Sequence, residues 1–350
     1  YLVLCIKNNL VKLKHLLIAI LLLPLTTSAQ NLIGEQTFRY NDTARKRPLT
    51  TEIWYPTTDK SKAPALKEGF PFVHEPTVRN GKLPIDKYPL IMISHGTGGG
   101  RLTMEWLADA LVKQGFIVTA VDHWGNTHDN KIAIDFVTPW QRAQDISFVL
   151  TQLLVDPQLD KVIDRQRIGA AGFSIGGYTV IALAGAKLDL KAMDDFTNTP
   201  DGAKEITIPE FPNLINTLDE KAIQASFDAA PPLKDKRIKA VFNMCPAVGQ
   251  GFTMASQFKD VDIPLYIVGA QSDSIAPVKT NALHYHKLMP KSKLYIVPGK
   301  AGHYVFLNEA LGELKQNGGM IFNDGPGVDR HAIHEQVGGM AVKFFKESLK

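Results

Sequence analysis

The sequence predicts an α/β fold in which a mostly parallel central sheet is covered by helices on both faces. From residue 90 onward, short runs that are apolar throughout alternate with longer segments whose apolar residues recur at helical spacing. Strands of this kind are buried on both faces, which is typical of parallel sheets. Apart from two earlier strands, the predicted strands are 90–93, 116–121, 168–173, 238–244, 264–268 and 293–297, and the predicted helices are 103–114, 139–155, 175–186, 278–288 and 330–346.

Two further strands are expected ahead of this alternation. Residues 33–40 and 49–55 alternate apolar with polar side chains, which is typical of strands with one solvated face. The short segment between them favours an antiparallel pair. A proline-rich, irregular stretch then covers residues 56–89, and the chain contains no internal repeat. Residues 30–350 are therefore expected to form one domain.

The segment 187–236 interrupts the alternation of strands and helices. At about fifty residues it is much longer than an ordinary connection between a helix and a strand. It mixes charged residues with apolar ones, among them Phe196, Phe211 and Phe227. We expect a partly helical, lid-like insertion over the C-terminal edge of the sheet, and a disordered surface loop is the alternative.

The N-terminal segment differs in composition from the rest of the chain. Three lysines precede an apolar run over residues 16–25, and small residues follow up to Ala29. This order is typical of a secretory signal peptide cleaved after residue 29. A membrane anchor is the alternative, but the apolar run is shorter than the roughly 20 residues that span a bilayer. We therefore expect residues 1–29 to be removed, leaving a secreted or periplasmic protein without stable membrane insertion.

Charge and cysteine content exclude several classes of protein. The formal charge of +4 falls to +1 without the three lysines of residues 1–29, and no run of Lys or Arg occurs in the domain. A nucleic-acid-binding surface is therefore not expected. Of the two cysteines, Cys5 lies in the expected signal peptide, so Cys245 has no partner for an intramolecular disulfide.

The segment Gly172–Gly176 (GFSIG) directly follows a predicted strand and directly precedes a predicted helix. A serine at such a sharp turn is exposed above the edge of the sheet, near a helix N-terminus where negative charge is stabilised. The flanking glycines let neighbouring backbone pass without a Cβ clash. We predict that Ser174 is a nucleophile, and a structural serine at a small-residue junction is the alternative.

A glycine-rich loop, His95–Gly100 (HGTGGG), follows the first buried strand. Such a loop leaves backbone N–H groups free for a ligand, and we predict that the amides of Thr97 and Ile175 form an oxyanion hole. A nucleotide-phosphate loop is excluded, because Arg101 stands where a glycine is required and no Gly-Lys-Ser/Thr occurs. His95 is expected to hold the loop rather than to act as a base.

Two loops supply the partners that a nucleophilic serine requires, a base and an acid that fixes the tautomer of the base. Asp273 lies just after the strand 264–268, and His303 follows the last predicted strand, 293–297. Parallel strands end at the same edge of a sheet, so both loops are expected beside Ser174. We predict a catalytic triad of these three residues. A turn-capping aspartate and a surface-loop histidine are the alternatives.

Several other side chains are weaker candidates. His123 and Trp124 follow a predicted strand at the same edge, where they either contact the substrate or pack in the interior. His331 and His334 could share a helix face with Glu335, but a metal site requires more ligands than this segment offers. Neither a metal nor another cofactor is expected.

With these residues in place, the chain from residue 33 onward resembles the α/β-hydrolase superfamily. More narrowly, it resembles bacterial predicted dienelactone hydrolases related to platelet-activating-factor acetylhydrolase. The resemblance rests on residues 47–56, 89–100 and 121–127, the Ser174 turn, and the loops of Asp273 and His303. It implies an α/β-hydrolase fold and an ester substrate, either a small molecule or a lipid. Two departures stand out: dienelactone hydrolases use a cysteine where this chain has Ser174, and the plasma acetylhydrolase takes its acid from the loop that corresponds to residues 242–246, where this chain has none.

The sequence thus predicts a secreted serine hydrolase that cleaves a carboxylic ester through an acyl-enzyme intermediate. One alternative is an acyltransferase that uses the same triad with an alcohol or amine as acceptor. The other alternative is a non-catalytic binding protein that has kept the fold.

Overall fold

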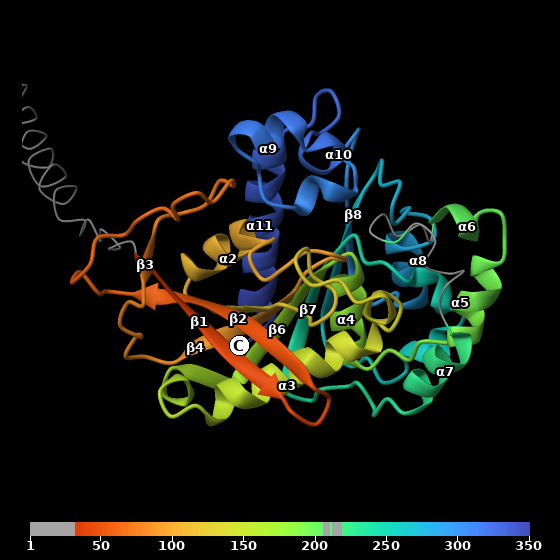
Figure 1. Ribbon diagram of the computed structural model, residues 1–350, viewed down its shortest axis with the longest axis horizontal. Coiled ribbons are helices and arrows are strands. Elements are labelled where there is room, and N and C mark those ends of the chain that lie inside the picture. The colour runs from red at the N-terminus through yellow and green to blue at the C-terminus, as the bar shows by residue number, and fades with distance from the viewer. Residues whose placement is uncertain (1–31, 206–210, 212–218) are drawn as a thin grey trace, which may run out of the picture. The chain divides into compact units, whose positions relative to one another are not determined.

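The computed structural model describes residues 32–205, 211 and 219–350. The expected signal peptide lies outside this part, as do residues 206–210 and 212–218 of the expected insertion. Within the described residues, nine strands form one mixed sheet in the order β3-β1-β2-β5-β4-β6-β7-β8-β9 (Figure 1). The strands are β1 (Leu32–Asp42), β2 (Arg47–Thr57), β3 (Thr77–Arg79), β4 (Tyr88–Ser94), β5 (Ile117–Val121), β6 (Ile163–Phe173), β7 (Ile238–Met244), β8 (Leu265–Ala270) and β9 (Lys293–Val297).

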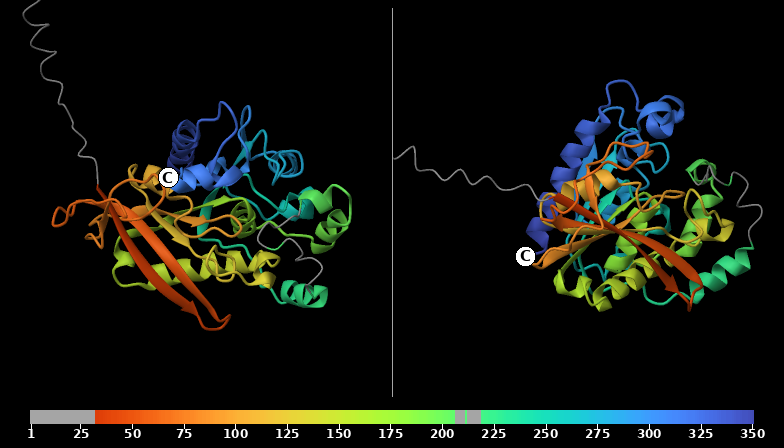
Figure 2. Two further views of the ribbon diagram at one scale, coloured as in Figure 1. Left: turned by 45° about the horizontal axis from the view of Figure 1, so that its top comes forward. Right: turned by 60° about the vertical axis from the view of Figure 1, so that its left-hand side comes forward.

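Among the described strands, β2 alone runs against the others. It pairs antiparallel with β1 along its whole length, from Leu32 opposite Thr57 to Asp42 opposite Arg47, and antiparallel with β5 on its other side. The remaining pairs are parallel. The expected antiparallel pair and the mostly parallel sheet are therefore confirmed. The β1–β2 hairpin, coloured red to orange, is seen from two further directions in Figure 2.

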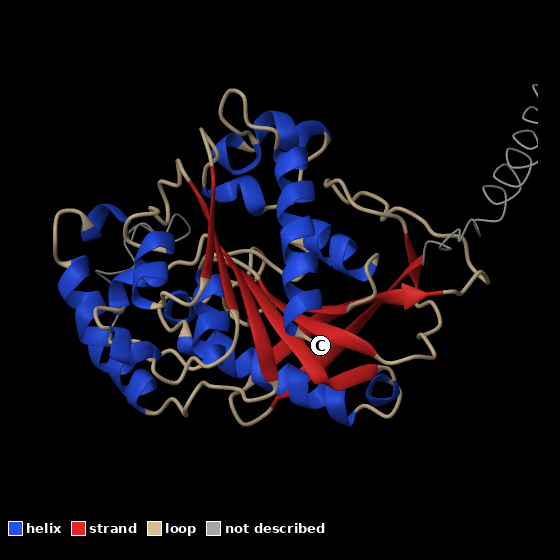
Figure 3. Cartoon of the chain, turned by 180° about the vertical axis from the view of Figure 1, so that it is seen from behind, coloured by secondary structure: helices blue, strands red, loops and turns tan. Residues whose placement is uncertain are grey.

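Helices cover both faces of this sheet (Figure 3). Along β4, Leu90 and Met92 point into one core, whereas Ile91 and Ile93 point into the other, and all four are buried. This two-residue period explains why the strand is apolar throughout. The first core is completed by α3 (Trp140–Val155), α4 (Ile175–Ala184) and α8 (Ala282–Leu288), and the second by α2 (Glu105–Val112) and α11 (Arg330–Ser348). None of the helices in this part of the chain combines the length and the hydrophobicity that a membrane span requires.

Some elements differ from the prediction. β6 begins at Ile163 rather than at residue 168. Ile163 lies opposite Tyr88 of β4. Residues 164–167 are polar and partly exposed, so this part of the strand has no apolar run by which to recognise it. β3 and two short helices, α9 (Gly312–Asn317) and α10 (Gly319–Phe322), lie in segments for which no element was predicted.

The described residues of segment 187–236 include three helices, α5 (Leu190–Thr197), α6 (Gly202–Glu205) and α7 (Glu220–Asp228). Two aromatic contacts join this segment to residues outside it. The rings of Phe227 and Trp140 lie 5.0 Å apart, and those of Phe211 and Phe136 lie 4.9 Å apart. The expected helical content is present, and a lid function for the segment stays a prediction.

The parallel strands β4 to β9 deliver their following loops to one edge of the sheet, because their carboxyl ends coincide there. The glycine-rich loop from His95 follows β4, and Ser174 follows β6. The next three strands in the sheet, β7, β8 and β9, are followed by Cys245, Asp273 and the loop of His303. The order of the strands therefore places the loops of all three predicted triad residues side by side.

Candidate active site

Ser174 lies in a strained turn between β6 and α4. Its φ of 56° and ψ of −123° fall in a region that residues with a side chain rarely adopt. The two flanking glycines make room for the turn: a Cβ on Gly172 would lie 2.1 Å from the carbonyl oxygen of Gly176, and one on Gly176 would lie 2.0 Å from the carbonyl oxygen of Ser94. Any larger residue at either position would push the serine out of place.

Hydrogen bonds from the turn after β7 hold the peptide of Ser174. The Ser174 N–H donates to the carbonyl oxygen of Met244 (2.9 Å), and the Ser174 carbonyl oxygen accepts from the N–H of Ala247 (3.0 Å). Strain of this kind persists only where surrounding structure fixes the backbone. The conformation of the serine therefore depends on the pairing of β6 with β7.

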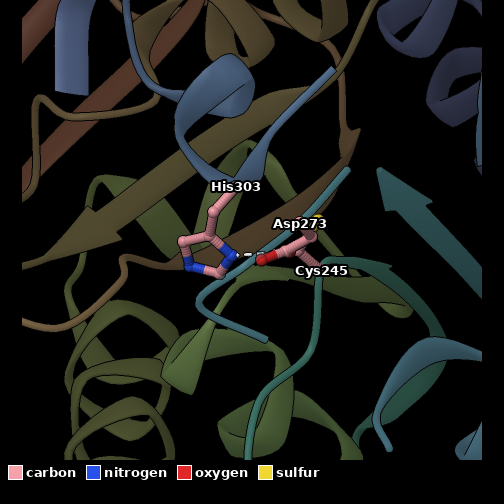
Figure 4. Close-up of side chains that lie close together, drawn as sticks. All are labelled: Cys245, Asp273 and His303. Atoms are coloured by element: carbon pink, nitrogen blue, oxygen red, sulfur yellow. Dashed lines mark hydrogen bonds and ion pairs between the residues drawn. The ribbon is translucent and has the colours of Figure 1, made fainter. Parts of the chain in front are cut away.

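The side chains of Ser174, His303 and Asp273 form a continuous hydrogen-bonded series, which we call the Ser174 cluster. His303 Nδ1 lies 2.7 Å from Asp273 Oδ2, and His303 Nε2 lies 2.9 Å from Ser174 Oγ. Because an ionised carboxylate only accepts, Nδ1 carries the proton and Nε2 accepts from the serine hydroxyl. Figure 4 shows the histidine ring aimed at the aspartate. This tautomer leaves Nε2 able to take the proton of Ser174.

The aspartate is fixed by its own loop. Asp273 Oδ1 accepts hydrogen bonds from the backbone N–H groups of Ile275 (2.9 Å) and Ala276 (2.7 Å). Its other oxygen, Oδ2, thereby faces His303. The carboxylate is buried, so these donors replace the water that it loses.

The short helical turn that carries His303 is anchored to both helices of the second core. The Trp106 Nε1–H donates to the carbonyl oxygen of Phe306 (2.8 Å), and the His334 Nε2–H donates to that of Val305 (2.8 Å). The rings of Trp106 and His334 stack, with their centroids 4.1 Å apart. Burial lowers the pKa of His334 to about 3, so it remains a neutral donor. His334 thus supports the loop of His303, and His331 lies exposed beside Glu335.

The two predicted oxyanion donors lie in the loops beside Ser174. Ile175 begins α4, and Thr97 lies in the loop after β4. A Cβ on Gly96 would lie 3.4 Å from the Cβ of Ser174, so this loop packs against the nucleophile turn. Within the described part of the chain, the backbone N–H of neither Thr97 nor Ile175 donates a hydrogen bond. Both amides are therefore available to an incoming oxygen.

A second series of the same residue types lies beneath the glycine-rich loop, and we call it the Ser94 cluster. Ser94 Oγ lies 2.9 Å from His123 Nε2, and His123 Nδ1 lies 3.0 Å from Asp145 Oδ2. Arg47 binds both oxygens of Asp145, each at 2.8 Å. Burial alone would raise the pKa of Asp145, but the hydrogen bonds from His123 and Arg47 hold it below its ordinary range. All three members of the cluster are fully buried.

The glycine-rich loop is tied to the Ser94 cluster through His95. The His123 backbone N–H donates to His95 Nε2 (3.2 Å), and the His95 Nδ1–H donates to the carbonyl oxygen of Gly96 (2.7 Å). The Arg142 guanidinium donates to the carbonyl oxygen of His95, and its Nε and Nη1 have no hydrogen-bond partner in the described residues. Burial lowers the pKa of Arg142 to about 9. The expectation that His95 holds the loop fits these contacts.

His123 and Trp124 were expected either to contact the substrate or to pack in the interior. His123 has no exposed surface, and both of its ring nitrogens have partners within the protein. Burial lowers its pKa to about 3, which does not suit a proton acceptor. Trp124 is partly buried against the first core, and its carbonyl oxygen accepts from Arg47 (2.9 Å). These contacts favour the packing alternative for His123.

Within the described residues, one group of side chains has the spacing of metal ligands. It consists of Cys245, Asp273 and His303, whose ligand atoms lie within 4.8 Å of one another. Burial raises the pKa of the Cys245 thiol well above its usual range, and the charge of Asp273 adds to this effect. The thiol therefore stays protonated, which does not favour metal binding.

Sequence reasoning assigned no role to several side chains of this region, which are Ser94 and Arg47 of the Ser94 cluster together with Cys245, Arg142 and Asp145. Cys245 was treated only as an unpaired cysteine, and the buried partners Arg142 and Asp145 were part of a predicted helix without a role. The signal that could have found the last two is their polar character within an apolar helix face. Arg142 lies four residues before Ile146 and Asp145 lies four residues before Val149, so both polar residues share the buried apolar face. No comparable signal exists for Cys245.

Comparison with known families adds to this geometry. The family model of platelet-activating factor acetylhydrolase, isoform II, matches residues 59–138, which include the glycine-rich loop. Cutinase est1 of Thermobifida alba is 24% identical over 231 residues, which are 64% of this chain and 57% of that protein. Cutinase 2 of Thermobifida cellulosilytica is 24% identical over 62% of this chain and 61% of its own length. The chain thus spans only part of the length of these relatives.

A solved structure shares the fold. The ferulic acid esterase from Streptomyces cinnamoneus superposes with a TM-score of 0.60 at 18% identity, over 93% of this chain and 92% of that one. Together with the sheet order and the helices on both faces, this match confirms the α/β-hydrolase fold that the sequence resemblance implied.

Proposed function

We propose that this chain, an α/β-hydrolase, is a serine esterase that cleaves a carboxylic ester through an acyl-enzyme intermediate. The observation that carries the proposal is the series Asp273–His303–Ser174, with contacts of 2.7 and 2.9 Å, at a serine whose neighbouring amides are unpaired. The family match and the similarity to two cutinases support ester hydrolysis in particular. The substrate class that we propose is a small-molecule or lipid ester.

The first half of the proposed reaction acylates the serine. Ser174 Oγ attacks the ester carbonyl carbon while its proton passes to His303 Nε2. The carbonyl oxygen becomes an oxyanion, which accepts from the N–H groups of Thr97 and Ile175. When the tetrahedral intermediate collapses, the alcohol leaves with the proton from Nε2. Asp273 keeps the imidazole oriented and stabilises its positive charge.

The second half releases the acid. Water gives a proton to His303 Nε2 and adds to the acyl carbon, and the same two amides hold the oxyanion. Collapse of this intermediate returns the proton to Ser174 Oγ and frees the carboxylic acid. The partial positive charge at the N-terminus of α4 favours negative charge in both intermediates.

Covalent labelling of the nucleophile tests the proposal. We expect a fluorophosphonate probe to label the wild type and Ser94→Ala, and to leave Ser174→Ala unlabelled. Ser94 is the matched control, because its hydroxyl is also within 2.9 Å of a histidine nitrogen but is buried. Hydrolysis of p-nitrophenyl esters of graded chain length should follow the same pattern. Activity in Ser174→Ala near the wild-type rate would overturn the assignment of the nucleophile.

Export is a further part of the proposal. It rests on the basic, apolar and small-residue order of residues 1–29. Expression of the full chain in a bacterial host with a periplasm, followed by N-terminal sequencing of the periplasmic protein, should give a mature chain that begins near Gln30. Recovery of the uncleaved chain in the cytoplasm or membrane fraction would contradict it.

A further inference from the structure

The turn after β7 contacts the nucleophile and the acid at the same time. On the nucleophile side, Met244 and Ala247 bind the two ends of the Ser174 peptide. Pro246 packs closely against Gly177 of α4: a Cβ on Gly177 would lie 2.7 Å from the Cα of Pro246. This turn therefore fixes the position of the strained serine.

The residue between these contacts, Cys245, faces the acid. Its Sγ lies within 4.8 Å of ligand atoms of both Asp273 and His303, and Figure 4 shows it beside the aspartate. The backbone of Cys245 has a φ of 42°, in the left-handed region that is unfavourable for residues other than glycine. Its N–H donates to the carbonyl oxygen of Val268 on β8 (2.7 Å), which holds the residue in this conformation.

The hydrogen bonds of Asp273 leave a place for a further donor. Its two oxygens offer about four acceptor sites. Three are used, two on Oδ1 by the amides of Ile275 and Ala276 and one on Oδ2 by His303. Cys245 is buried and its pKa is raised by burial, so it carries the S–H proton that a donor needs.

We propose that the Cys245 thiol donates a hydrogen bond to the carboxylate of Asp273 and is a positioning residue for the acid. The proposal deepens the esterase proposal and rests on it for its kinetic consequences. The thiol links the Asp273 carboxylate to the turn after β7, which holds the serine. The turn therefore resists displacement of the carboxylate, and the carboxylate resists displacement of the turn. A thiol suits this place because it is a weak donor. It orients the carboxylate and leaves most of the negative charge to His303.

Infrared spectroscopy tests the contact without reference to activity. In a Cys5→Ser background, the remaining S–H stretch belongs to Cys245. We expect this band at lower wavenumber than that of a free thiol, and we expect it to move to higher wavenumber in Asp273→Asn, whose amide oxygen is a weaker acceptor. A band at the free-thiol position in the unsubstituted site would overturn the proposal, whatever the protein hydrolyses.

Steady-state kinetics test the consequence. We expect Cys245→Ala to lower kcat for p-nitrophenyl butyrate about fivefold with little change in KM, the effect of one modest hydrogen bond. Cys245→Ser keeps a donor and should remain within about twofold of wild type. In the Asp273→Asn background, Cys245→Ala should cause no further loss, because the two residues act through one contact. Equal losses in both backgrounds, or an equally slow serine variant, would show a packing role instead.

The two measurements separate the two proposals. Wild-type protein that fails to hydrolyse any ester contradicts the esterase proposal, whereas the infrared band still decides whether the thiol is bonded to Asp273. Thermal unfolding of each variant shows whether it is folded. If Cys245→Ala does not fold, the proposal is tested by the position of the Cys245 S–H stretching band in Cys5→Ser and by its shift in Asp273→Asn.

Discussion

The molecule contains two serine–histidine–aspartate clusters with nearly the same internal distances. In the Ser174 cluster the two contacts measure 2.9 and 2.7 Å, and in the Ser94 cluster they measure 2.9 and 3.0 Å. The surroundings differ. Ser94 ends a regular strand that is paired on both sides, whereas Ser174 has a strained backbone at the start of a helix. Ser174 is 7% exposed and Ser94 is not exposed at all.

Electrostatics separate the two clusters further. Arg47 binds Asp145. Burial and the positive charge of Arg142 together lower the pKa of His123 to about 3. A proton on His123 is therefore strongly disfavoured. Asp273 binds no arginine or lysine among the described residues. Under the proposed mechanism, a hydrogen-bonded series alone does not suffice: the histidine must be able to accept a proton, and unpaired amide N–H groups must lie beside an accessible hydroxyl.

The largest effect is expected from alanine at the two histidines. His303→Ala should lower kcat by about 10⁴- to 10⁶-fold, because the base is lost. His123→Ala should mainly lower the free energy of unfolding, because it leaves a cavity in the interior and takes the histidine partner from the buried Ser94 hydroxyl. Ester hydrolysis and urea unfolding of both variants measure the two effects. A folded His123→Ala protein as inactive as His303→Ala would erase the distinction between the clusters.

The next largest effect is expected at Asp273. Asp273→Asn should lower turnover by about 10³- to 10⁴-fold, because the amide no longer orients and stabilises the imidazolium. Asn243 on β7 is the reference position, since it is buried and lies in the segment 242–246, where the family resemblance would place the acid. Changes at Asn243 should lower turnover far less. Comparable losses at both positions would place the acid elsewhere.

A smaller effect, on stability rather than on rate, is expected at Asp145, the acid of the Ser94 cluster. Asp145→Asn leaves the guanidinium of Arg47 without its main buried partner. We expect a loss of about 3–5 kcal/mol in the free energy of unfolding. Asp273→Asn should cost less than about 2 kcal/mol, because its backbone donors can still bond to the amide oxygen. Chemical denaturation of the two variants gives this comparison directly, and equal losses would contradict it.

The smallest effect is a pH dependence of stability from His123. Its pKa is about 3 in the folded protein and near the ordinary 6.5 when unfolded. Below pH 6.5 the unfolded chain therefore binds a proton that the folded protein does not, and stability is lost as the pH falls. The stability advantage of wild type over His123→Asn should shrink by about 1.4 kcal/mol per pH unit. An advantage that stays constant between pH 7 and pH 4 would contradict burial of a neutral imidazole.

Much of the edge that carries the proposed triad could be predicted because local sequence encodes it. The turn around Ser174 requires small residues at fixed positions, and Gly172 and Gly176 reveal it. Asp273 and His303 follow apolar strands, so the strand pattern alone places them at one edge. The structure brings their side chains within hydrogen-bond distance of each other and of the serine. Their catalytic roles remain proposals.

Other features depend on contacts that no local pattern encodes. The Ser94 cluster joins residues from β4, the loop after β5 and α3, and its existence follows from the order β5-β4-β6 in the sheet. The proximity of Cys245 to Asp273 involves one residue with a left-handed backbone in the turn after β7. The polar start of β6 is recognisable as a strand only from its pairing with β4.

The hydrogen bonds between the Ser174 peptide and the turn after β7 have a consequence for the folding of the chain. β6 and β7 are separated by α4 and the segment 187–236, so their pairing closes a long loop. Until that loop closes, the hydrogen bonds from Met244 and Ala247 are missing, so the strained φ of Ser174 has less support. Under the proposed mechanism, the geometry of the nucleophile is thus a property of the assembled sheet and is not encoded by the GFSIG turn alone.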